Sequence, residues 1–352
     1  MGGVSAVSAA ARIAPTAAGP APAFRIGAPL TKRILARLPG PRFLWMLAWG
    51  LSPFAAYEIA YRLWSLPTYA GVQSNLVIAT VNLIWLWAAG RLADRMDRLQ
   101  PTLERLLQPE DLGPRRHPFR HVGSVRGPLA VAALFVLGWD ALDFLRFPGF
   151  ANGFTVVTVF LGLVALSTFV WVYGVGLLGL DRIGRRGLRL QPFAGDPHLG
   201  LKPLGSFAFE AFLLCGLGVA PALVLLLTDV RSTVETLAFV AFFSALFVVS
   251  AYTLHRQLVA AKAARVRWAR GLVAAALGSI EQESDAPIDA AAIRDALAAA
   301  RPGLAAATEI ERRALAIQEW PFDATIIRTV AAILTSVTAV IIARLLLSRL
   351  GM

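Results

Sequence analysis

Three acidic residues lie within long apolar stretches of the sequence, where a charge is costly unless it has a function or a partner. Glu58 belongs to the apolar stretch 43–64. Asp140 and Asp143 belong to the stretch 127–147 and are three residues apart, so they share one helix face. Carboxylates that meet in a low dielectric raise one another's pKa and can carry a proton. The sequence therefore gives Glu58, Asp140 and Asp143 as a candidate ion or proton site.

The same charges also fit structural ion pairs. An arginine follows Glu58 by four residues and another follows Asp143 by three, and both spacings let side chains meet on a helix. A further pair is predicted between Glu210 and Arg328, because each lies early in an apolar stretch at the same membrane face. We expect Glu210 and Arg328 to form a structural ion pair that ties the last helix to the others.

The segment "GDPHLGLKPLG" (195–205) carries the polar residues Asp196, His198 and Lys202 between two apolar stretches. An Asp before a Pro favours a turn, Lys202 suits the headgroup level, and Pro203 suits the first turn of a helix. Asp196 and His198 could instead bind a cation or act as an acid–base pair. Two ligands do not make a metal site, so the prediction is a headgroup or turn site without a metal or cofactor.

The composition indicates a membrane protein. Of 352 residues, 57% are hydrophobic and only 16% are charged, whereas a soluble domain averages about 25% charged residues. The net charge of +12 comes from basic residues that flank apolar stretches, which favours anionic lipid headgroups and not nucleic acid as the partner. Cys215 is the single cysteine and excludes an internal disulfide. The sequence has no P-loop, HExxH, CxxC or GxSxG motif, so an enzyme is not the first expectation.

Seven apolar stretches are long enough to span a bilayer as helices, which needs about 20 residues each. They are 43–64, 71–90, 127–147, 153–180, 206–227, 234–255 and 324–346. The connecting segments on one side carry twenty-eight Lys and Arg residues against five on the other. The positive-inside rule then predicts a multi-pass protein of the bacterial inner membrane, with a cytoplasmic N-terminus and an external C-terminus.

The expected fold is all-α: three transmembrane hairpins plus one helix, with a small cytoplasmic helical bundle. Residues 1–40 form a disordered tail, 41–256 hold six spans with cytoplasmic loops 91–126 and 181–204, 257–322 are a cytoplasmic helical region, and 323–352 hold the last span. One helix is expected to run from 234 to 280, followed by helices at 289–300 and 304–319. An apolar stripe from Leu92 to Leu106, with a kink or a restart at Pro101, is expected to join residues 256–320 in that bundle.

The stretches "LQPFAGDPHLGLKPLGSF" and "IQEWPFDATIIRTVAAIL" resemble a loop and a final-span entry of multi-pass bacterial membrane proteins with an "HPD…GGL…LG" pattern. The resemblance covers about the last half of the chain. It departs from that pattern at Pro192, which replaces a His, and at His198 and Leu199, which replace small residues. It implies the membrane fold and no activity.

Three functions fit these features. The first is a structural or accessory membrane protein whose cytoplasmic helices bind a partner protein or a second copy of the chain. The alternative is a proton or small-cation transporter or channel that uses Glu58, Asp140 and Asp143. The second alternative is a lipid-modifying membrane enzyme with the 191–204 loop at the headgroup level, where Asp196 and His198 would act.

Overall fold

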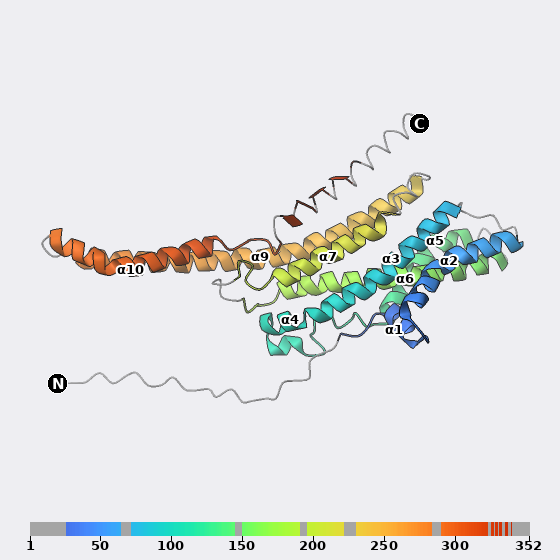
Figure 1. Ribbon diagram of the computed structural model, residues 1–352, viewed down its shortest axis with the longest axis horizontal. Helices are drawn as coiled ribbons and strands as arrows, with labels where there is room; N and C mark the ends of the chain where they lie inside the picture. The colour runs from blue at the N-terminus through green and yellow to red at the C-terminus, as the bar shows by residue number, and fades with distance from the viewer. Residues whose placement is uncertain are drawn as a thin grey trace.

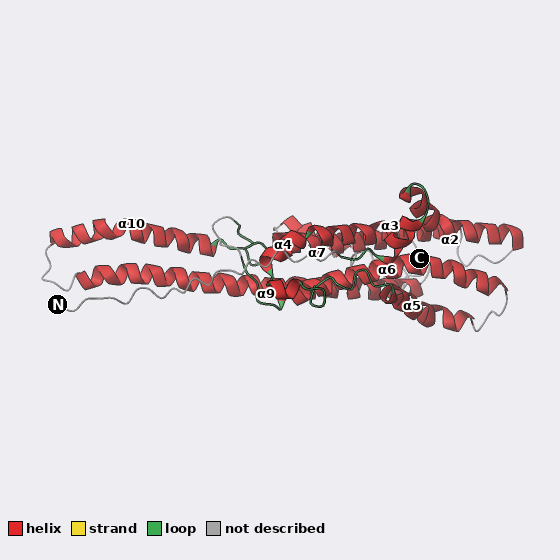
Figure 2. Cartoon of the chain, turned by 90° about the horizontal axis from the view of Figure 1, so that it is seen from below, coloured by secondary structure: helices red, strands yellow, loops and turns green. Residues whose placement is uncertain are grey.

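The chain folds into a bundle of long helices from which one helical hairpin projects (Figure 1). The computed structural model describes the backbone of residues 26–64, 72–144, 150–190, 196–221, 230–283 and 290–322, and scattered positions between 325 and 339. Every regular element in these ranges is a helix, as Figure 2 shows. The helices are α1 (Leu30–Arg37), α2 (Arg42–Trp64), α3 (Val72–Arg98), α4 (Gln100–Leu106), the 3-10 turn η1 (Pro109–Leu112), α5 (Arg126–Phe144), α6 (Phe150–Gly184), α7 (Lys202–Val219), α9 (Val230–Glu283) and α10 (Ala290–Leu315).

Four helices are long and apolar enough to cross a membrane. These segments are Leu76–Arg98 of α3, Phe160–Gly184 of α6, Lys202–Val219 of α7 and Ala238–Ala275 within α9. Helices α2 and α5 coincide with two more of the predicted spans. The chain is therefore an all-helical protein with at least four candidate spans, while the count of seven stays a prediction.

Helices α3 and α6 form the centre of the bundle. Helix α2 packs on α3, α5 packs on α6, and α9 packs on α6 and α7. Aromatic side chains fill the contact between α6 and α9, where Phe169 and Tyr173 lie against Phe243. Two hydroxyl groups fix the same contact, because Tyr173 donates to the carbonyl of Phe243 and Ser250 donates to that of Leu177, at 3.0 and 2.8 Å.

The apolar stripe that follows the second predicted span is buried in the bundle. Leu92, Met96, Leu99, Leu103 and Leu106 are all at most 3% exposed. The helix breaks at Leu99 and α4 restarts at Gln100, with Pro101 in its first turn, where proline is well suited. Helix α4 packs on α3 and η1, whereas α10 packs on α9. The stripe and two residues of the second segment, Leu258 and Ile317, belong to one core cluster, and a separate small bundle of residues 92–107 and 256–320 stays a prediction.

Helix α9 is 54 residues long and continues without interruption from the bundle into the projecting hairpin. Its sequence prediction, 234–280, missed only a few residues at each end. Helix α10 returns along α9 as a single helix, although two helices separated at Pro302 were expected. A proline inside a helix costs about 3 kcal/mol. Packing of α10 along α9 outweighs that cost, and this long-range packing was not visible in the local sequence.

Residues 30–37 were expected to belong to a disordered tail, and they form α1 instead. The helix is amphipathic: Thr31 and Leu35 are buried, while Arg37 is exposed. Lys32 forms an ion pair with Asp94 of α3, which holds α1 against the bundle beside the start of α2. A short helix of this kind is stabilised mainly by such tertiary contacts, which composition alone did not reveal.

Candidate functional site: the base of the projecting hairpin

Residues 316–322 leave α10 and cross the end of the bundle from which the hairpin projects; we call this segment the strap. Its apolar residues Ile317 and Phe322 are only 2% and 5% exposed. The Phe322 ring stacks on Phe247 of α9, with ring centroids 5.8 Å apart. Burying two such side chains stabilises the docked strap by roughly 1.5–3 kcal/mol each. The strap therefore fastens the end of α10 to the bundle.

The turn that contains Asp196 receives the strap. The two carboxylate oxygens of Asp196 accept hydrogen bonds from the backbone N–H groups of His198 and Gly200, at 2.9 and 2.7 Å. Leu199 and Gly200 have left-handed backbone angles, with φ of 54° and 89°, which local side-chain hydrogen bonds help to hold. The turn exposes the carbonyl of Pro197, which accepts a hydrogen bond from the N–H of Gln318 in the strap at 3.0 Å.

Two histidines from different parts of the chain bind consecutive carbonyls of the strap. His198 Nδ1 lies 3.2 Å from the Trp320 carbonyl oxygen, and His255 Nδ1 of α9 lies 2.8 Å from that of Glu319. A carbonyl only accepts, so each Nδ1 must carry a proton. The His255 ring also stacks on Trp320, with centroids 4.2 Å apart. These contacts fix the path of the strap across the bundle.

A glycine and an ion pair complete the junction. A Cβ atom placed on Gly205 of α7 would lie 2.0 Å from the carbonyl oxygen of Pro321. The strap thus passes directly over α7 at a position where no side chain fits. On the hairpin side, Lys262 of α9 binds Glu319 across 3.1 Å. The junction therefore couples α7, α9 and the turn between α6 and α7 through one short segment.

The predicted turn site accordingly contains residues that support the strap. Asp196 is engaged by backbone donors, and His198 is 3% exposed and bound to the strap. Lys202 is exposed at the first residue of α7. A cavity of ≈ 130 Å³ adjoins the turn; its lining residues are Thr102, Arg105, Leu106, Asp196, Gly200 and Pro203. Among the described residues, no group of three or more His, Cys, Asp and Glu side chains is arranged to hold a metal.

His117 lies in the loop after η1 and is 1% exposed. Its Nδ1 accepts a hydrogen bond from the Phe119 N–H at 3.2 Å, so its Nε2, 3.1 Å from Gln100 Oε1, carries the proton. Burial first, and then the nearby Arg186 guanidinium, lower the pKa of His117 to about 4. This histidine is therefore neutral near pH 7 and fixes the loop against α4.

The described residues include one of the three predicted intramembrane carboxylates. Glu58 lies 3.8 Å from Arg62, one helical turn later. This is the structural pairing that the spacing allowed as the alternative. The side chains of Asp140 and Asp143 lie outside the described residues, so the cluster of three carboxylates stays a prediction.

Glu210 lies between α7 and α3 and is bound by two arginines of α3. Its carboxylate oxygens lie 2.8 Å from Arg91 Nε and 3.1 Å from Arg95 Nε. The predicted partner, Arg328, is exposed at the start of the last predicted span. Glu210 thus ties α7 to α3, in place of the expected tie to the last helix. Repeated Arg at positions 91 and 95 of one helix face was the signal for this contact.

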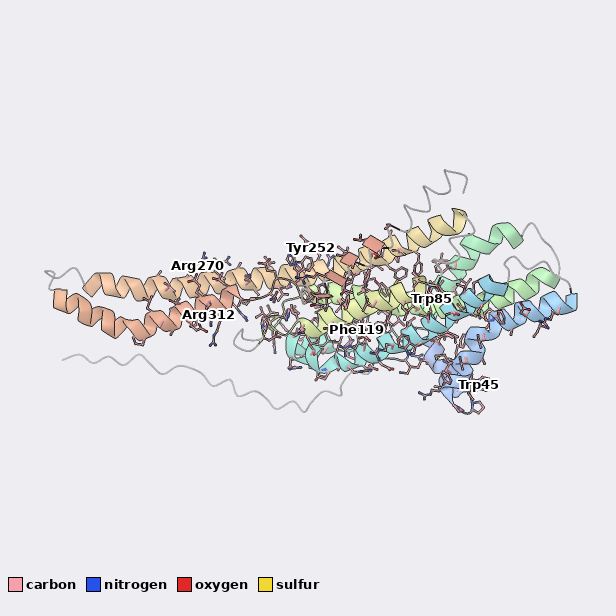
Figure 3. All side chains as sticks on the ribbon, turned by 45° about the horizontal axis from the view of Figure 1, so that its top comes forward. Trp45, Trp85, Phe119, Tyr252, Arg270 and Arg312 are labelled. Atoms are coloured by element: carbon pink, nitrogen blue, oxygen red, sulfur yellow. The ribbon has the colours of Figure 1, made fainter. Side chains whose placement is uncertain are left out.

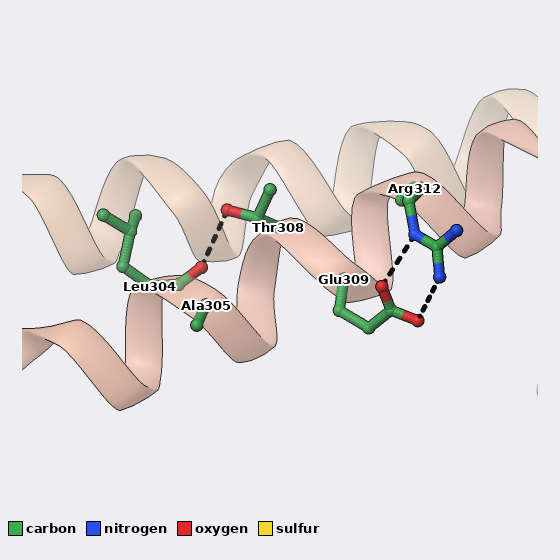
Figure 4. Close-up of a pocket in the computed structure, with 5 residues that line it drawn as sticks. All are labelled: Leu304, Ala305, Thr308, Glu309 and Arg312. Carbon is green, nitrogen blue, oxygen red and sulfur yellow. Dashed lines mark hydrogen bonds and ion pairs between the residues drawn. The ribbon is translucent and has the colours of Figure 1, made fainter.

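The outer face of α10 carries a shallow open groove, which Figure 4 shows. Glu309 at its rim binds Arg312 through two contacts of 2.7 and 2.9 Å and also binds Arg313 at 2.7 Å. Hydrogen bonds from these two arginines lower the pKa of Glu309 to about 2. The charges of this face are therefore paired within α10 and remain in solvent.

Comparison of the chain with models of protein families, with curated proteins and with solved structures gives no match. The geometry therefore carries the functional argument alone.

Proposed function

We propose that this chain is a structural or accessory protein of the bacterial inner membrane, whose helices anchor a cytoplasmic hairpin that binds a partner. One observation carries the proposal: α9 is a single helix, Val230–Glu283, that is long and apolar enough to span a membrane yet continues into the hairpin with α10. Figure 3 places Arg270 and Arg312 along this hairpin, far from Trp85 and Phe119 in the bundle. A rigid helical arm is well suited to present a binding surface away from a membrane.

The strap supports this proposal, because it gives α10 its own attachment to the bundle, in addition to the continuous helix α9. Without it, α10 would be attached to the membrane region only through α9. The proposal also includes seven spans, a cytoplasmic N-terminus and an external C-terminus, as the charge distribution predicts. Arg37 and Arg42 are exposed beside Trp45 at the start of α2, which favours anionic headgroups as neighbours at that level.

Photocrosslinking in cells tests the proposed function. A photoreactive amino acid is placed at exposed hairpin positions, Ala264 on α9 and Ala305 on α10, and at the exposed Phe242 of the candidate span in α9 as a control. We expect discrete protein adducts from the hairpin and none from Phe242. Absence of adducts at every hairpin position would contradict partner binding.

Cysteine accessibility tests the orientation. Cys215 is buried and is the single cysteine, so a Cys215→Ser chain provides a background without thiols. We expect Ala264→Cys to react with an impermeant maleimide in inside-out vesicles and to be protected in intact cells. The reverse pattern would overturn the proposed topology.

A further inference from the structure

One face of α9 remains apolar and uncovered after α9 leaves the bundle. We call it the α9 stripe; it consists of Ala264, Trp268, Gly271, Leu272 and Ala275, which are all exposed. These residues recur at intervals of three and four, the spacing of one helix face. Trp268 is 54% exposed and Leu272 is 36% exposed. A large aromatic side chain on a solvent-facing stripe is typical of a docking surface.

The α9 stripe faces away from α10. The contact between α9 and α10 is marked by Ala269, which is fully buried, and by the Arg270–Glu311 ion pair at 3.0 Å. At 3.6 residues per turn, Trp268 and Ala264 point about 100° and about 140° away from Ala269. Helix α10 therefore covers one face of α9 and leaves the stripe exposed.

The α9 stripe also continues a packed interface. The same side of α9 packs on α6, where Gln257 donates a hydrogen bond to the carbonyl of Gly184 at 2.7 Å. Helix α6 ends at Gly184, and Ala264, the first residue of the α9 stripe, follows Gln257 by about two turns. A helix that lay on the stripe would thus occupy the space directly beyond α6. Its contact with α9 would extend the existing α6–α9 packing.

The charge around the α9 stripe is basic. Between Arg256 and Ile280, α9 carries five Lys and Arg residues and no acidic residue, and two of the five, Lys262 and Arg270, pair with Glu319 and Glu311. Arg267 is exposed at the edge of the stripe. Residues 182–189, at the end of α6 and just after it, add four arginines; Arg185 is one of them, and its side chain pairs with Asp181 but is 68% exposed. An acidic occupant gains from these charges, and a basic one is repelled.

We infer that the α9 stripe is the docking site for an acidic amphipathic helix of a partner protein. The inference rests on the proposed function and names the chemistry of the partner. A second copy fits less well, because copies in one membrane are related by a two-fold axis along the membrane normal. That axis brings the same basic surroundings of the stripe together from both copies, and like charges oppose the contact.

The test uses the full chain in nanodiscs of phosphatidylcholine and two fluorescent synthetic peptides. Both peptides have the same leucine stripe at spacings of three and four; their other positions are Glu and Ala in one, Lys and Ala in the other. Fluorescence anisotropy should show the acidic peptide binding at least tenfold more tightly than the basic one. Trp268→Ala combined with Leu272→Ala should weaken the acidic peptide at least tenfold.

Two further variants make the result specific. Arg267→Glu combined with Arg185→Glu should reverse the preference between the peptides. Leu315→Ala removes an exposed apolar side chain of α10 and should leave binding unchanged. Equal binding of the two peptides, or acidic-peptide binding that Trp268→Ala and Leu272→Ala do not weaken, overturns the inference.

Two alternative occupants have outcomes of their own. Efficient disulfide formation between copies carrying Trp268→Cys, in the Cys215→Ser background, would assign the stripe to a second copy. Quenching of Trp268 by brominated anionic lipid, absent in the Trp268→Phe variant, would assign it to the membrane surface. Either result overturns the inference but leaves the proposed function intact if photocrosslinks form at Ala305 of α10.

Discussion

Replacing Gly205 by alanine should release the strap from the bundle. The added Cβ would lie 2.0 Å from the Pro321 carbonyl oxygen and 2.8 Å from the Pro321 carbonyl carbon. Both atoms belong to the backbone, so no side-chain rotation relieves the overlap. Either the strap stays and the junction is overpacked, or the strap moves and gives up its contacts.

The two routes set the size of the effect. Overpacking costs about 1–3 kcal/mol. Leaving the bundle removes the burial of Phe322, worth roughly 1.5–3 kcal/mol, and the Gln318–Pro197 hydrogen bond, worth about 1 kcal/mol. The cheaper route is followed, so we expect a cost of about 2 kcal/mol. Since about 1.4 kcal/mol is a factor of ten, the opening equilibrium of the strap should rise roughly 30-fold.

Hydrogen exchange measured by mass spectrometry reads this opening directly. The Gln318 amide, which donates to Pro197, should exchange roughly 30-fold faster in Gly205→Ala. The matched control is Gly216→Ala, in the same helix, where an added Cβ has open space within 4 Å. An alanine there should leave strap exchange unchanged. Strap exchange at the wild-type rate in Gly205→Ala would refute the packing argument.

Three further predictions concern the loops and the bundle. The free energy of unfolding should fall as the pH drops from about 6.5 toward 4, because His117 is protonated in the unfolded chain over this range, whereas its pKa in the folded chain is about 4. In urea unfolding measured across this pH range, His117→Asn should lose the part of the pH dependence that His117 contributes. Asp196→Ala, which removes both acceptors of the turn, should destabilise the strap by about 2 kcal/mol and Asp196→Asn by less, as thermal unfolding in detergent would reveal. Glu210→Gln should cost about 1 kcal/mol in the same assay, since its arginine partners are partly exposed, whereas Arg328→Ala should change stability by less than about 0.5 kcal/mol; a larger effect of Arg328→Ala would favour the pairing that the sequence suggested.

The helices that the sequence predicted well are those with local signals. The span 234–255 continues without a helix breaker to Ile280, and α9 extends only slightly beyond those limits. Pro101 marked the restart of α4 because its missing N–H costs nothing in a first turn. A helix break was also predicted at Pro302, but α10 continues through this proline because it packs against α9. Local preference decides where tertiary contacts are few, and yields where they are many.

The junction was the part that no local pattern could give. His198 contacts a carbonyl 122 residues later, and His255 contacts one 64 residues later. A histidine in the sequence indicates that a hydrogen bond can form, but it does not indicate which residue is the partner. The Asp196 carboxylate binds backbone N–H groups within four residues, which is the kind of local contact that a sequence pattern can indicate. The α9 stripe was present as a spacing of Ala, Trp and Leu, yet its exposure depends on which face α10 covers.

Because α9 is one continuous helix, the rotation of the hairpin about the helix axis depends on how many residues separate it from the bundle. Each residue inserted between Phe247, which stacks on the strap, and Lys262, which pairs with Glu319, would turn the hairpin by about 100°. One inserted residue would point Trp268 in a new direction, whereas seven would restore its direction to within about 20°. The number of residues in α9 between the bundle and the hairpin therefore fixes the direction in which Trp268 points.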